Sequence, residues 1–403
     1  LGTQLLYNAL VSKKNRMKFY FLDNTDPEGI DQVMSEIGHK LNNTLTLVIS
    51  KSGETTETRN TMMEVRKLYE DYSLDFTKHA VAVTAVDSKL DILAKNESWL
   101  SCFPMWEWIG GRTSVLSSVG LLPAALYGID INNLILGAKK MDEVTRCTNV
   151  KKNPAAILAW MWYQSGEGMG KKDMIVLPYK DRLIFLSRYI QQLVMESLGK
   201  EKNFDGNTIH HGVTVYGNKG STDQHSFLQQ LIEGPSNFFV TFIEVLKDRE
   251  NLSLEVETGI TSGDFLQGFL LGTRDALFKK GHESICITIK EVNDQTLSAL
   301  IALFERAVGI YAFLIGINAY NQPGVELGKK LAEDIIELLL NIQEYLKSYP
   351  KKQFTASELS EALGVKEKTE IVFRLLLRLA INGRVKKIPH KNIFLTAFKQ
   401  IDS

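Results

Sequence analysis

The chain has 403 residues, and its composition is typical of a soluble globular protein with two or three domains. Lys plus Arg and Asp plus Glu number 47 each, so no overall charge favours nucleic acid, an anionic membrane or a polycationic partner. Three widely spaced cysteines, without metal-ligand spacing, favour a reducing compartment and are interpreted as inert core residues. Without a basic-then-apolar leader or an uninterrupted apolar run of about 18 residues, we expect a cytoplasmic protein and no membrane segment.

The first part of the chain alternates short apolar segments with amphipathic patterns. The spacing of Leu5, Leu6, Ala9 and Leu10 predicts an opening helix. Strands are then predicted at residues 18–22, 44–49 and 80–85, with helices near 29–41, 57–72 and 115–126. This alternation predicts a parallel sheet covered by helices on both faces.

A second alternation follows a helical stretch at about 131–164. Strands are predicted at 174–177, 213–216, 238–245 and 284–289, and helices near 182–198, 223–232, 264–279 and 296–317. The simplest architecture is α/β, with two doubly wound, flavodoxin-like parallel-sheet domains at residues 1–125 and 126–348. Ligands of such sheets bind at the carboxyl ends of the strands, so functional residues are expected in the loops that follow strands.

The last segment, residues 349–403, differs in character. Helices at 355–363 and 367–381, then Asn382-Gly383 and a hairpin over 384–397, predict a small winged-helix-like unit. Residues 350–403 hold eleven Lys plus Arg and five Asp plus Glu, a net charge of +6 that would suit DNA phosphates. Many such units only pack against protein, and a modest positive excess is also typical of a solvated face, so we expect no nucleic-acid partner.

A loop rich in hydroxyl groups follows the predicted strand at 44–49. It reads Ser50-Lys51-Ser52-Gly53-Glu54-Thr55 and leads directly into a helix. Hydroxyls, one ammonium and the free N–H groups of a helix N-terminus suit a phosphate monoester. Ordinary helix capping is the alternative, but capping needs only one or two such residues. The absence of a G-x-x-x-x-G-K-[ST] pattern argues against a nucleoside triphosphate.

Four more segments carry residues of catalytic type. Gly110-Gly111-Arg112 combines a flexible backbone with a permanent cation, and Gln192 and Glu196 share one helical face. His225 lies near a predicted helix start, and Lys329 follows Gln322-Pro323-Gly324-Val325-Glu326-Leu327-Gly328 at the start of a long amphipathic helix. Each residue taken alone is more often a solvated surface side chain than a catalytic group.

Together the five segments, S-K-S-G-E-T-T-E-T, G-G-R-T-S, Q-Q-L-V-M-E-S, T-D-Q-H-S-F and Q-P-G-V-E-L-G-K, closely resemble the phosphoglucose isomerase (glucose-6-phosphate isomerase) family. The resemblance extends over about residues 1–346 and implies the sugar-isomerase (SIS) fold. It also implies reversible aldose–ketose isomerisation of glucose 6-phosphate and fructose 6-phosphate through a cis-enediolate, a step of glycolysis and gluconeogenesis, with no metal or cofactor.

The resemblance also assigns roles to individual residues. Glu196 would be the base that moves the proton between C2 and C1, and Arg112 would stabilise the enediolate. His225 and Lys329 would assist ring opening, with His225 supplied by the other subunit of a homodimer. Substrate-binding residues would be Ser50, Lys51, Ser52 and Thr55 at the phosphate, with Gly111, Gln192 and Gln322 lining the site.

Three qualifications accompany this expectation. Family members carry G-I-G-G-S immediately before the segment that matches Leu1-Gly2, so for a molecule that begins at Leu1 we expect little or no activity. An alternative function is a sugar-phosphate-sensing SIS-domain regulator with a DNA-binding tail, which would have no need of Glu196, Arg112, His225 and Lys329 together. A third possible function is that of a related isomerase that also accepts mannose 6-phosphate.

Overall fold

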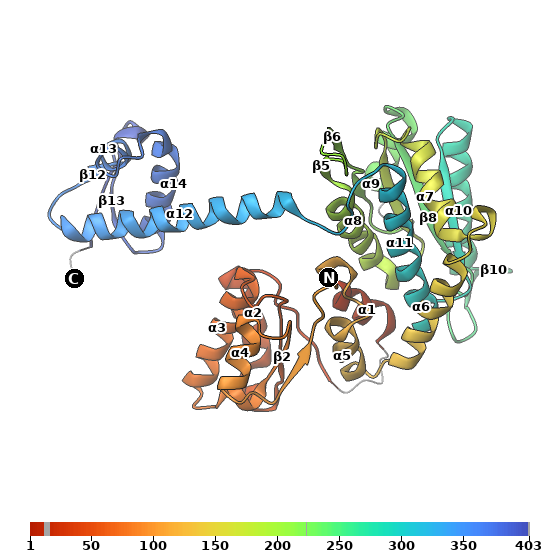
Figure 1. Ribbon diagram of the computed structural model, residues 1–403, viewed down its shortest axis with the longest axis horizontal. Helices are drawn as coiled ribbons and strands as arrows, with labels where there is room; N and C mark the ends of the chain where they lie inside the picture. Colours follow the sequence, from red (N-terminus) through yellow and green to blue (C-terminus); the bar gives the residue numbers. More distant parts are fainter. Residues whose placement is uncertain (12–16, 223, 402–403) are drawn as a thin grey trace. The chain divides into compact units, whose positions relative to one another are not determined.

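The computed structural model describes residues 1–11, 17–222 and 224–401 (Figure 1). The chain divides into two compact units, Leu1–Asn321 and Gln322–Ser403, and each is described by itself. The first unit contains both predicted parallel sheets, one on each side of residue 125. The α/β fold class with parallel sheets is confirmed, while the domain boundaries near 125 and 348 stay predictions.

The first sheet has three parallel strands in the order β1-β2-β3: β1 (Thr46–Ile49), β2 (Ala80–Thr84) and β3 (Ser101–Pro104). Every residue of β2 is buried, as expected of a central strand. In Figure 1 this sheet forms one lobe with α2 (Pro27–Ile37), α3 (Thr56–Asp71) and α4 (Lys89–Asn96). The 3-10 turns η1 (Gly38–Asn43) and η2 (Phe76–His79) lead into β1 and β2. Because these strands are parallel, their carboxyl ends lie at the same edge of the sheet.

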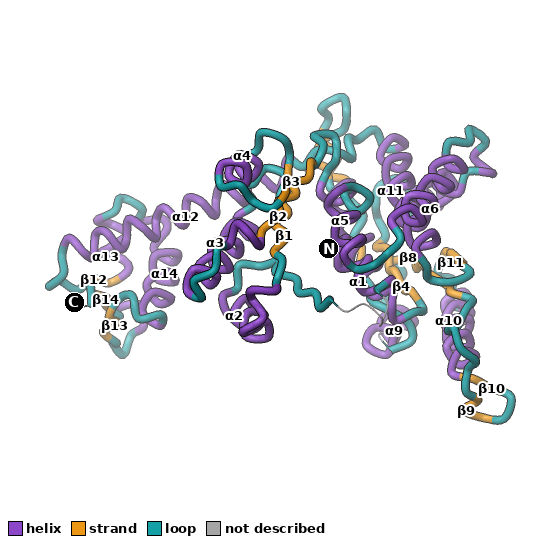
Figure 2. Tube along the Cα trace, turned by 90° about the horizontal axis from the view of Figure 1, so that it is seen from below, coloured by secondary structure: helices purple, strands orange, loops and turns teal. Residues whose placement is uncertain are grey.

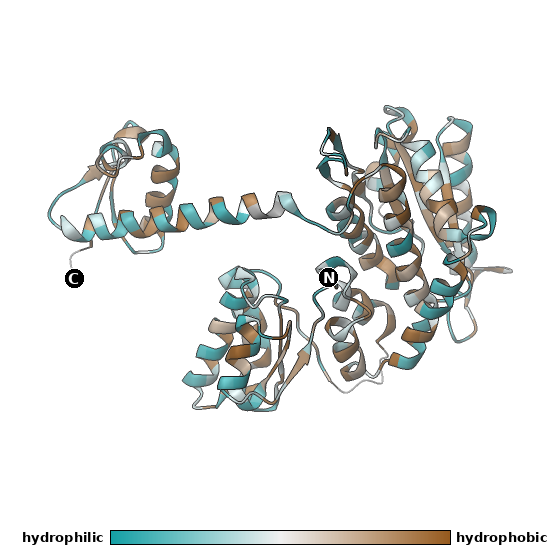
Figure 3. Ribbon diagram, in the orientation of Figure 1, coloured by the Kyte–Doolittle hydropathy of each residue, from teal (hydrophilic) through white to brown (hydrophobic). Residues whose placement is uncertain are grey.

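The second sheet has the order β11-β8-β4-β7, again with all strands parallel. Its strands are β4 (Asp173–Pro178), β7 (Val215–Tyr216), β8 (Phe238–Val245) and β11 (Ser284–Ile289). The connecting helices are α8 (Ile184–Leu198), α9 (Gln224–Glu233), α10 (Ser262–Lys279) and α11 (Asp294–Leu314). Figure 3 shows the hydrophobic residues concentrated on these strands and on α11, the interior of the lobe.

The predicted helical stretch at 131–164 is two helices, α6 (Ile131–Thr145) and α7 (Pro154–Ser165), separated by η4 (Val150–Lys152). Pro154 begins the second helix, because proline fits the first turn but not the interior. Helix α6 packs closely on α11 at Gly137, where a Cβ would lie 2.1 Å from the Gln295 carbonyl oxygen. By length and composition α11 is the one described helix that could cross a membrane. It is mostly buried, as the core helix of a soluble protein would be, so it is weak evidence for a membrane span.

One predicted strand is wrong. Residues 17–23 form no strand, although their alternation is regular. Phe19 and Phe21 pack against the core of the second sheet, whereas Tyr20 and Leu22 pack against the core of the first. The alternation therefore reflects an extended segment that bridges two cores, not a strand paired in a sheet. Nearby, α1 (Gly2–Leu10) packs on α5 (Ser118–Leu126) and on α8, as the opening helical pattern predicts.

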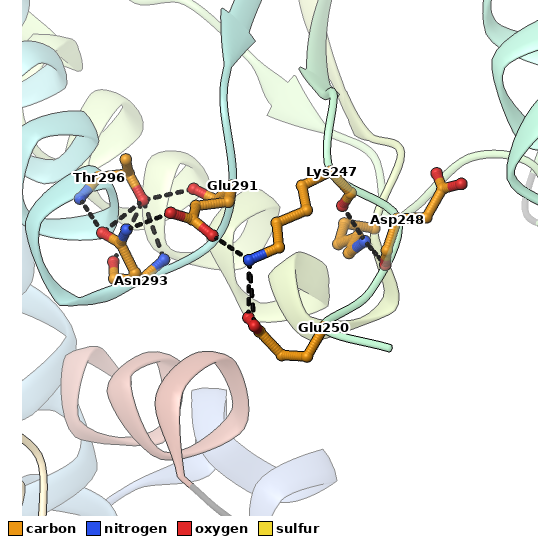
Figure 4. A network of polar contacts seen from close by, with 7 residues as sticks. Lys247, Asp248, Glu250, Glu291, Asn293 and Thr296 are labelled. Atoms are coloured by element: carbon orange, nitrogen blue, oxygen red, sulfur yellow. Dashed lines mark hydrogen bonds and ion pairs between the residues drawn. The ribbon is translucent and has the colours of Figure 1, made fainter. Parts of the chain in front are cut away.

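The loops after β8 and β11 are tied together by a polar network (Figure 4). The Lys247 ammonium contacts both Glu250 and Glu291, and Asn293 and Thr296 form the capping box that starts α11. Lys180, after β4, donates to the Lys247 and Asp248 carbonyls. The Lys247 charge at this edge of the second sheet is therefore paired with two carboxylates.

The smaller elements of the first unit are η3 (Gly111–Thr113), η5 (Asp181–Leu183) and two short antiparallel pairs. One pair is β5 (Lys200–Lys202) with β6 (Thr208–His211), and the other is β9 (Glu255–Glu257) with β10 (Ile260–Thr261). The three cysteines were predicted to be core residues. All three are free thiols, but they are only partly buried.

The second unit, seen in Figure 2, begins with the long helix α12 (Pro323–Ser348). Its other elements are α13 (Ala356–Ala362), η6 (Lys366–Lys368), α14 (Thr369–Ile381), η7 (Ile393–Leu395) and the antiparallel sheet β12-β14-β13 (Phe354–Thr355, Ala397–Lys399 and Lys386–Ile388). Asn382-Gly383 ends α14, with Gly383 at φ +66°. The hairpin predicted after it, over 384–397, is confirmed as the antiparallel pair of β13 and β14, which extends to Lys399. The winged-helix assignment stays a prediction.

Candidate active site

The predicted phosphate loop lies at the carboxyl end of β1 and ends where α3 begins. Ser50 is buried, donates to the Thr55 hydroxyl at 3.0 Å and accepts from the Gly53 N–H at 3.1 Å. Gly53 has φ +74°, and a Cβ there would lie 2.4 Å from the Leu90 nitrogen, so only glycine fits this turn. Thr55 is the N-cap residue of α3 but makes no side-chain capping bond. The first N–H groups of α3 are therefore available to an anion.

Lys51 joins this loop to the loop that precedes Arg112. Its ammonium donates to the Glu107 carbonyl at 2.6 Å and to the Ile109 carbonyl at 3.0 Å. Ser52 lies at the exposed side of the loop and accepts the Glu54 N–H at 3.1 Å. The four predicted phosphate ligands thus come from one short segment.

Arg112 is a buried cation, with 4% of its surface exposed. Its Nε donates to the Ser197 hydroxyl at 2.6 Å, and Nη2 donates to the Ala319 carbonyl. Its Nη1 lies 3.8 Å from Glu196 Oε1. Burial lowers the pKa of the guanidinium, and the Glu196 carboxylate opposes that effect. The guanidinium is held by neighbours separated by up to 207 residues in sequence, so its position is fixed by the tertiary fold.

Glu196 lies near the end of α8, one turn after Gln192. Its side chain is 24% exposed. The Oε2 atom is buried and has no hydrogen-bond partner among the described residues. A buried carboxylate oxygen without a donor is uncommon and calls for an explanation, such as a ligand group that supplies the missing proton. Glu196 and Arg112 therefore place a carboxylate beside a fixed cation.

A cavity of about 890 Å³ connects Arg112 with the Lys51 region. It is lined by Lys51, Gly110, Arg112, Glu305 and Tyr320 among others. Glu305, on α11, accepts a hydrogen bond from the Tyr189 hydroxyl of α8 at 2.9 Å. Burial raises the pKa of Glu305 to about 7, and the Tyr189 hydrogen bond opposes this. The cavity thus has charges of both signs on its wall.

Two residues at or just after the end of α8 were not predicted as site residues from the sequence. Ser197 accepts the hydrogen bond from Arg112, and the buried Lys200 donates to the carbonyls of Glu196 and Ser197. Burial lowers the pKa of Lys200, Arg112 lowers it further, and Glu196 opposes both effects. A Gly-Lys pair directly after a helical pattern, at Gly199-Lys200, is the signal that a helix end is held by a cation.

The remaining predicted site residues of the first unit are all exposed. Gln192 is exposed on α8, and Gly111 is an exposed residue of η3 next to Arg112. His225 is exposed near the start of α9. Gln322 and Lys329 belong to the second unit, so their positions relative to Glu196 are not described. Among the described residues, no three His, Cys, Asp or Glu side chains could hold a metal ion together.

A comparison with protein families gives the phosphoglucose isomerase model a match over residues 1–349. The chain belongs to the phosphoglucose isomerase family. The family predicted from the five motifs is therefore confirmed. The match includes all of the first unit, with Arg112 and Glu196, and α12 of the second, with Lys329.

Curated relatives agree with this family assignment. The glucose-6-phosphate isomerase of Desulfitobacterium hafniense is 59% identical over 382 residues, which cover 95% of this chain and 72% of the relative. That of a Geobacter species is 56% identical over 383 residues, with the same two coverages. The crystal structure of a glucose-6-phosphate isomerase from Chlamydia trachomatis has a TM-score of 0.77 at 28% identity, covering 84% of this chain and 68% of that one. Phosphoglucose isomerase membership thus rests on sequence and fold together.

Proposed function

We propose that the protein that carries this chain interconverts glucose 6-phosphate and fructose 6-phosphate. The observation that carries the proposal is the Arg112–Glu196 pair, with one carboxylate oxygen that has no donor among the described residues. The names of the relatives support the substrate.

In this proposal Glu196 takes the proton from C2 of the open-chain sugar and returns it at C1. A carboxylate is a suitable base for such a transfer when it is within hydrogen-bond reach of the carbon acid. Arg112 stabilises the negative charge of the enediolate, because a buried guanidinium needs no reorganisation when that charge develops. It also cannot compete for the proton, since arginine stays protonated.

The phosphate is bound by the loop after β1. Ser50, Lys51, Ser52 and Thr55 supply hydroxyls and an ammonium, and the first N–H groups of α3 supply donors on the positive end of the helix dipole. Gly111, Gln192 and Gln322 line the sugar site by match to the family motifs.

The proposed test is turnover of Glu196→Gln in the protein that carries this chain. Gln keeps the size of the side chain but cannot accept the proton, so kcat is expected to fall by about 10³-fold or more with little change in KM. Fructose 6-phosphate formation from glucose 6-phosphate measures this directly. Exposed Glu201, five residues along, supplies the control variant Glu201→Gln, which is expected to keep wild-type turnover. Near-normal turnover of Glu196→Gln would contradict the assigned role.

His225 and Lys329 are proposed to assist ring opening, with His225 acting across the interface of a homodimer. The exposure of His225 on α9 supports a role toward a second subunit. Mixing inactive His225→Ala and Glu196→Gln proteins, with subunit exchange, should restore about one quarter of wild-type activity, because half of the subunits pair unlike and each such dimer has one intact site. If His225 acts within its own subunit, the mixture stays inactive.

We also propose a cytoplasmic location. The phosphate of the substrate carries charge that keeps it from crossing a bilayer unaided, so the enzyme must share its compartment. Cell fractionation that places the protein outside the cytoplasm would contradict this.

A further inference from the structure

Lys200 is a lysine in an unusual setting. It is 7% exposed, whereas lysines are almost never fully buried unless they are paired. It is the first residue of β5, one residue after Gly199 ends α8, and its side chain turns back under the helix end. The ammonium donates to the Ser197 carbonyl at 2.8 Å and to the Glu196 carbonyl at 3.3 Å.

These bonds have a clear local function. The last carbonyls of a helix lack intrahelical partners and carry the negative end of the helix dipole. A cation at this position satisfies two of them and fixes the direction of the last turn. The residue whose carbonyl is held is Glu196 itself, so the backbone that directs the proposed base is held by Lys200.

A second cation, Arg112, contacts the same turn of α8. Arg112 donates to the Ser197 hydroxyl at 2.6 Å and lies 3.8 Å from the Glu196 carboxylate. Ser197 is therefore contacted by Arg112 through its side chain and by Lys200 through its main chain. Two buried cations therefore contact the last turn of α8, Arg112 at its side chains and Lys200 at its main-chain carbonyls.

We propose that Lys200 is a positioning residue for the isomerisation: by its bonds to the Glu196 and Ser197 carbonyls it fixes the last turn of α8 so that Glu196 faces the sugar. This inference rests on the proposed function, because it needs Glu196 to act as the base. The hydrogen bonds that the Lys200 ammonium makes with described residues go to the end of α8, so its loss should affect kcat more than KM.

The test compares Lys200→Met, which keeps the length without the charge, with Lys200→Arg, which keeps the charge. Lys202→Met is the matched control, since Lys202 lies on the same short strand but is exposed. For Lys200→Met we expect kcat to fall about tenfold with less than about a twofold change in KM, because a loosened last turn misdirects the base without altering the phosphate loop. Lys200→Arg should recover most of the wild-type kcat, and Lys202→Met should keep it. A wild-type kcat in Lys200→Met, or a loss of kcat that Lys200→Arg does not recover, would overturn the proposal.

A measurement that does not depend on turnover accompanies these variants. In protein labelled with [5-¹³C]glutamate, the Glu196 signal is identified by its loss in Glu196→Gln. Its shift should show an alkaline step when Lys200 loses its proton, and that step should be absent from Lys200→Arg, since arginine does not deprotonate in this range. Identical Glu196 signals in the two proteins would overturn the proposal even if Lys200→Met does not fold. An inactive wild-type protein that shows the step would instead contradict the proposed function alone.

Discussion

Replacement of Glu305 by glutamine is expected to stabilise the protein at alkaline pH. Glu305 is a partly buried residue of α11 whose carboxyl group meets Tyr189 of α8, and desolvation raises its pKa from the ordinary 4.5 to about 7. Because the folded state holds the proton more tightly than the unfolded state, the stability that Glu305 contributes is fully present below about 4.5. It is lost as the pH rises through about 7.

The size of the effect follows from this difference in pKa, which corresponds to about 3 kcal/mol at 1.36 kcal/mol per pH unit. Glu305 also lines the 890 Å³ cavity and is partly exposed, so screening by solvent reduces the effect to about 2 kcal/mol. Glutamine keeps the acceptor for the Tyr189 hydroxyl without a charge to bury. For a unit of this size the midpoint of thermal unfolding of Glu305→Gln should exceed that of the wild type by about 3 °C at pH 8.

The assay is thermal unfolding of both proteins at pH 5 and pH 8, at the same scan rate. The difference in midpoint should be small at pH 5 and largest at pH 8. Glu143→Gln, an exposed position on α6, is the control and should show no such pH dependence. Equal midpoint differences at the two pH values would refute the reasoning, because they would show that Glu305 is not the group whose ionisation is coupled to folding.

Two further changes test the packing and the phosphate loop. Gly137→Ala should lower the free energy of unfolding by about 2 kcal/mol, because its Cβ would lie 2.1 Å from the Gln295 carbonyl oxygen. Gly268→Ala is the control: it has open space around it and should raise the free energy of unfolding by up to about 1 kcal/mol. Equal effects of the two changes in denaturant titrations would contradict the close α6–α11 crossing. Lys51→Met should raise the KM for the sugar phosphate about tenfold and lower kcat less, because it removes a charge-assisted contact to the phosphate. An unchanged KM in steady-state assays, beside an exposed control such as Lys67→Met, would place the phosphate elsewhere.

Periodicity predicted most of the fold because most elements have a single buried face. The bounds of β8 and β11 were predicted to the residue, since both are rich in β-branched and aromatic residues. Periodicity failed at residues 18–22, where alternate side chains pack in two different cores and no strand of the described residues pairs with the segment. It also missed β3, an edge strand of alternating exposure that ends in a proline.

The candidate site was only partly accessible to sequence reasoning. The phosphate loop is contiguous, so its hydroxyls and lysine could be read from one segment. The neighbours of Arg112 could not, because Ser197 and the Ala319 carbonyl are 85 and 207 residues away and no local pattern links them. Lys200 went unnoticed for a related reason: a lysine after a helix is ordinarily solvated, and only tertiary burial makes this one different.

The two carbonyl bonds of Lys51 have a consequence for the way an anion is recognised. An ammonium has three protons, and two of them already point at the Glu107 and Ile109 carbonyls, so one is left for a phosphate oxygen. The loop must therefore draw most of its affinity from neutral hydroxyl and main-chain donors. Their strength depends on orientation and is screened little by dissolved ions, so added salt should weaken sugar-phosphate binding far less than it would at a site built from several free cations.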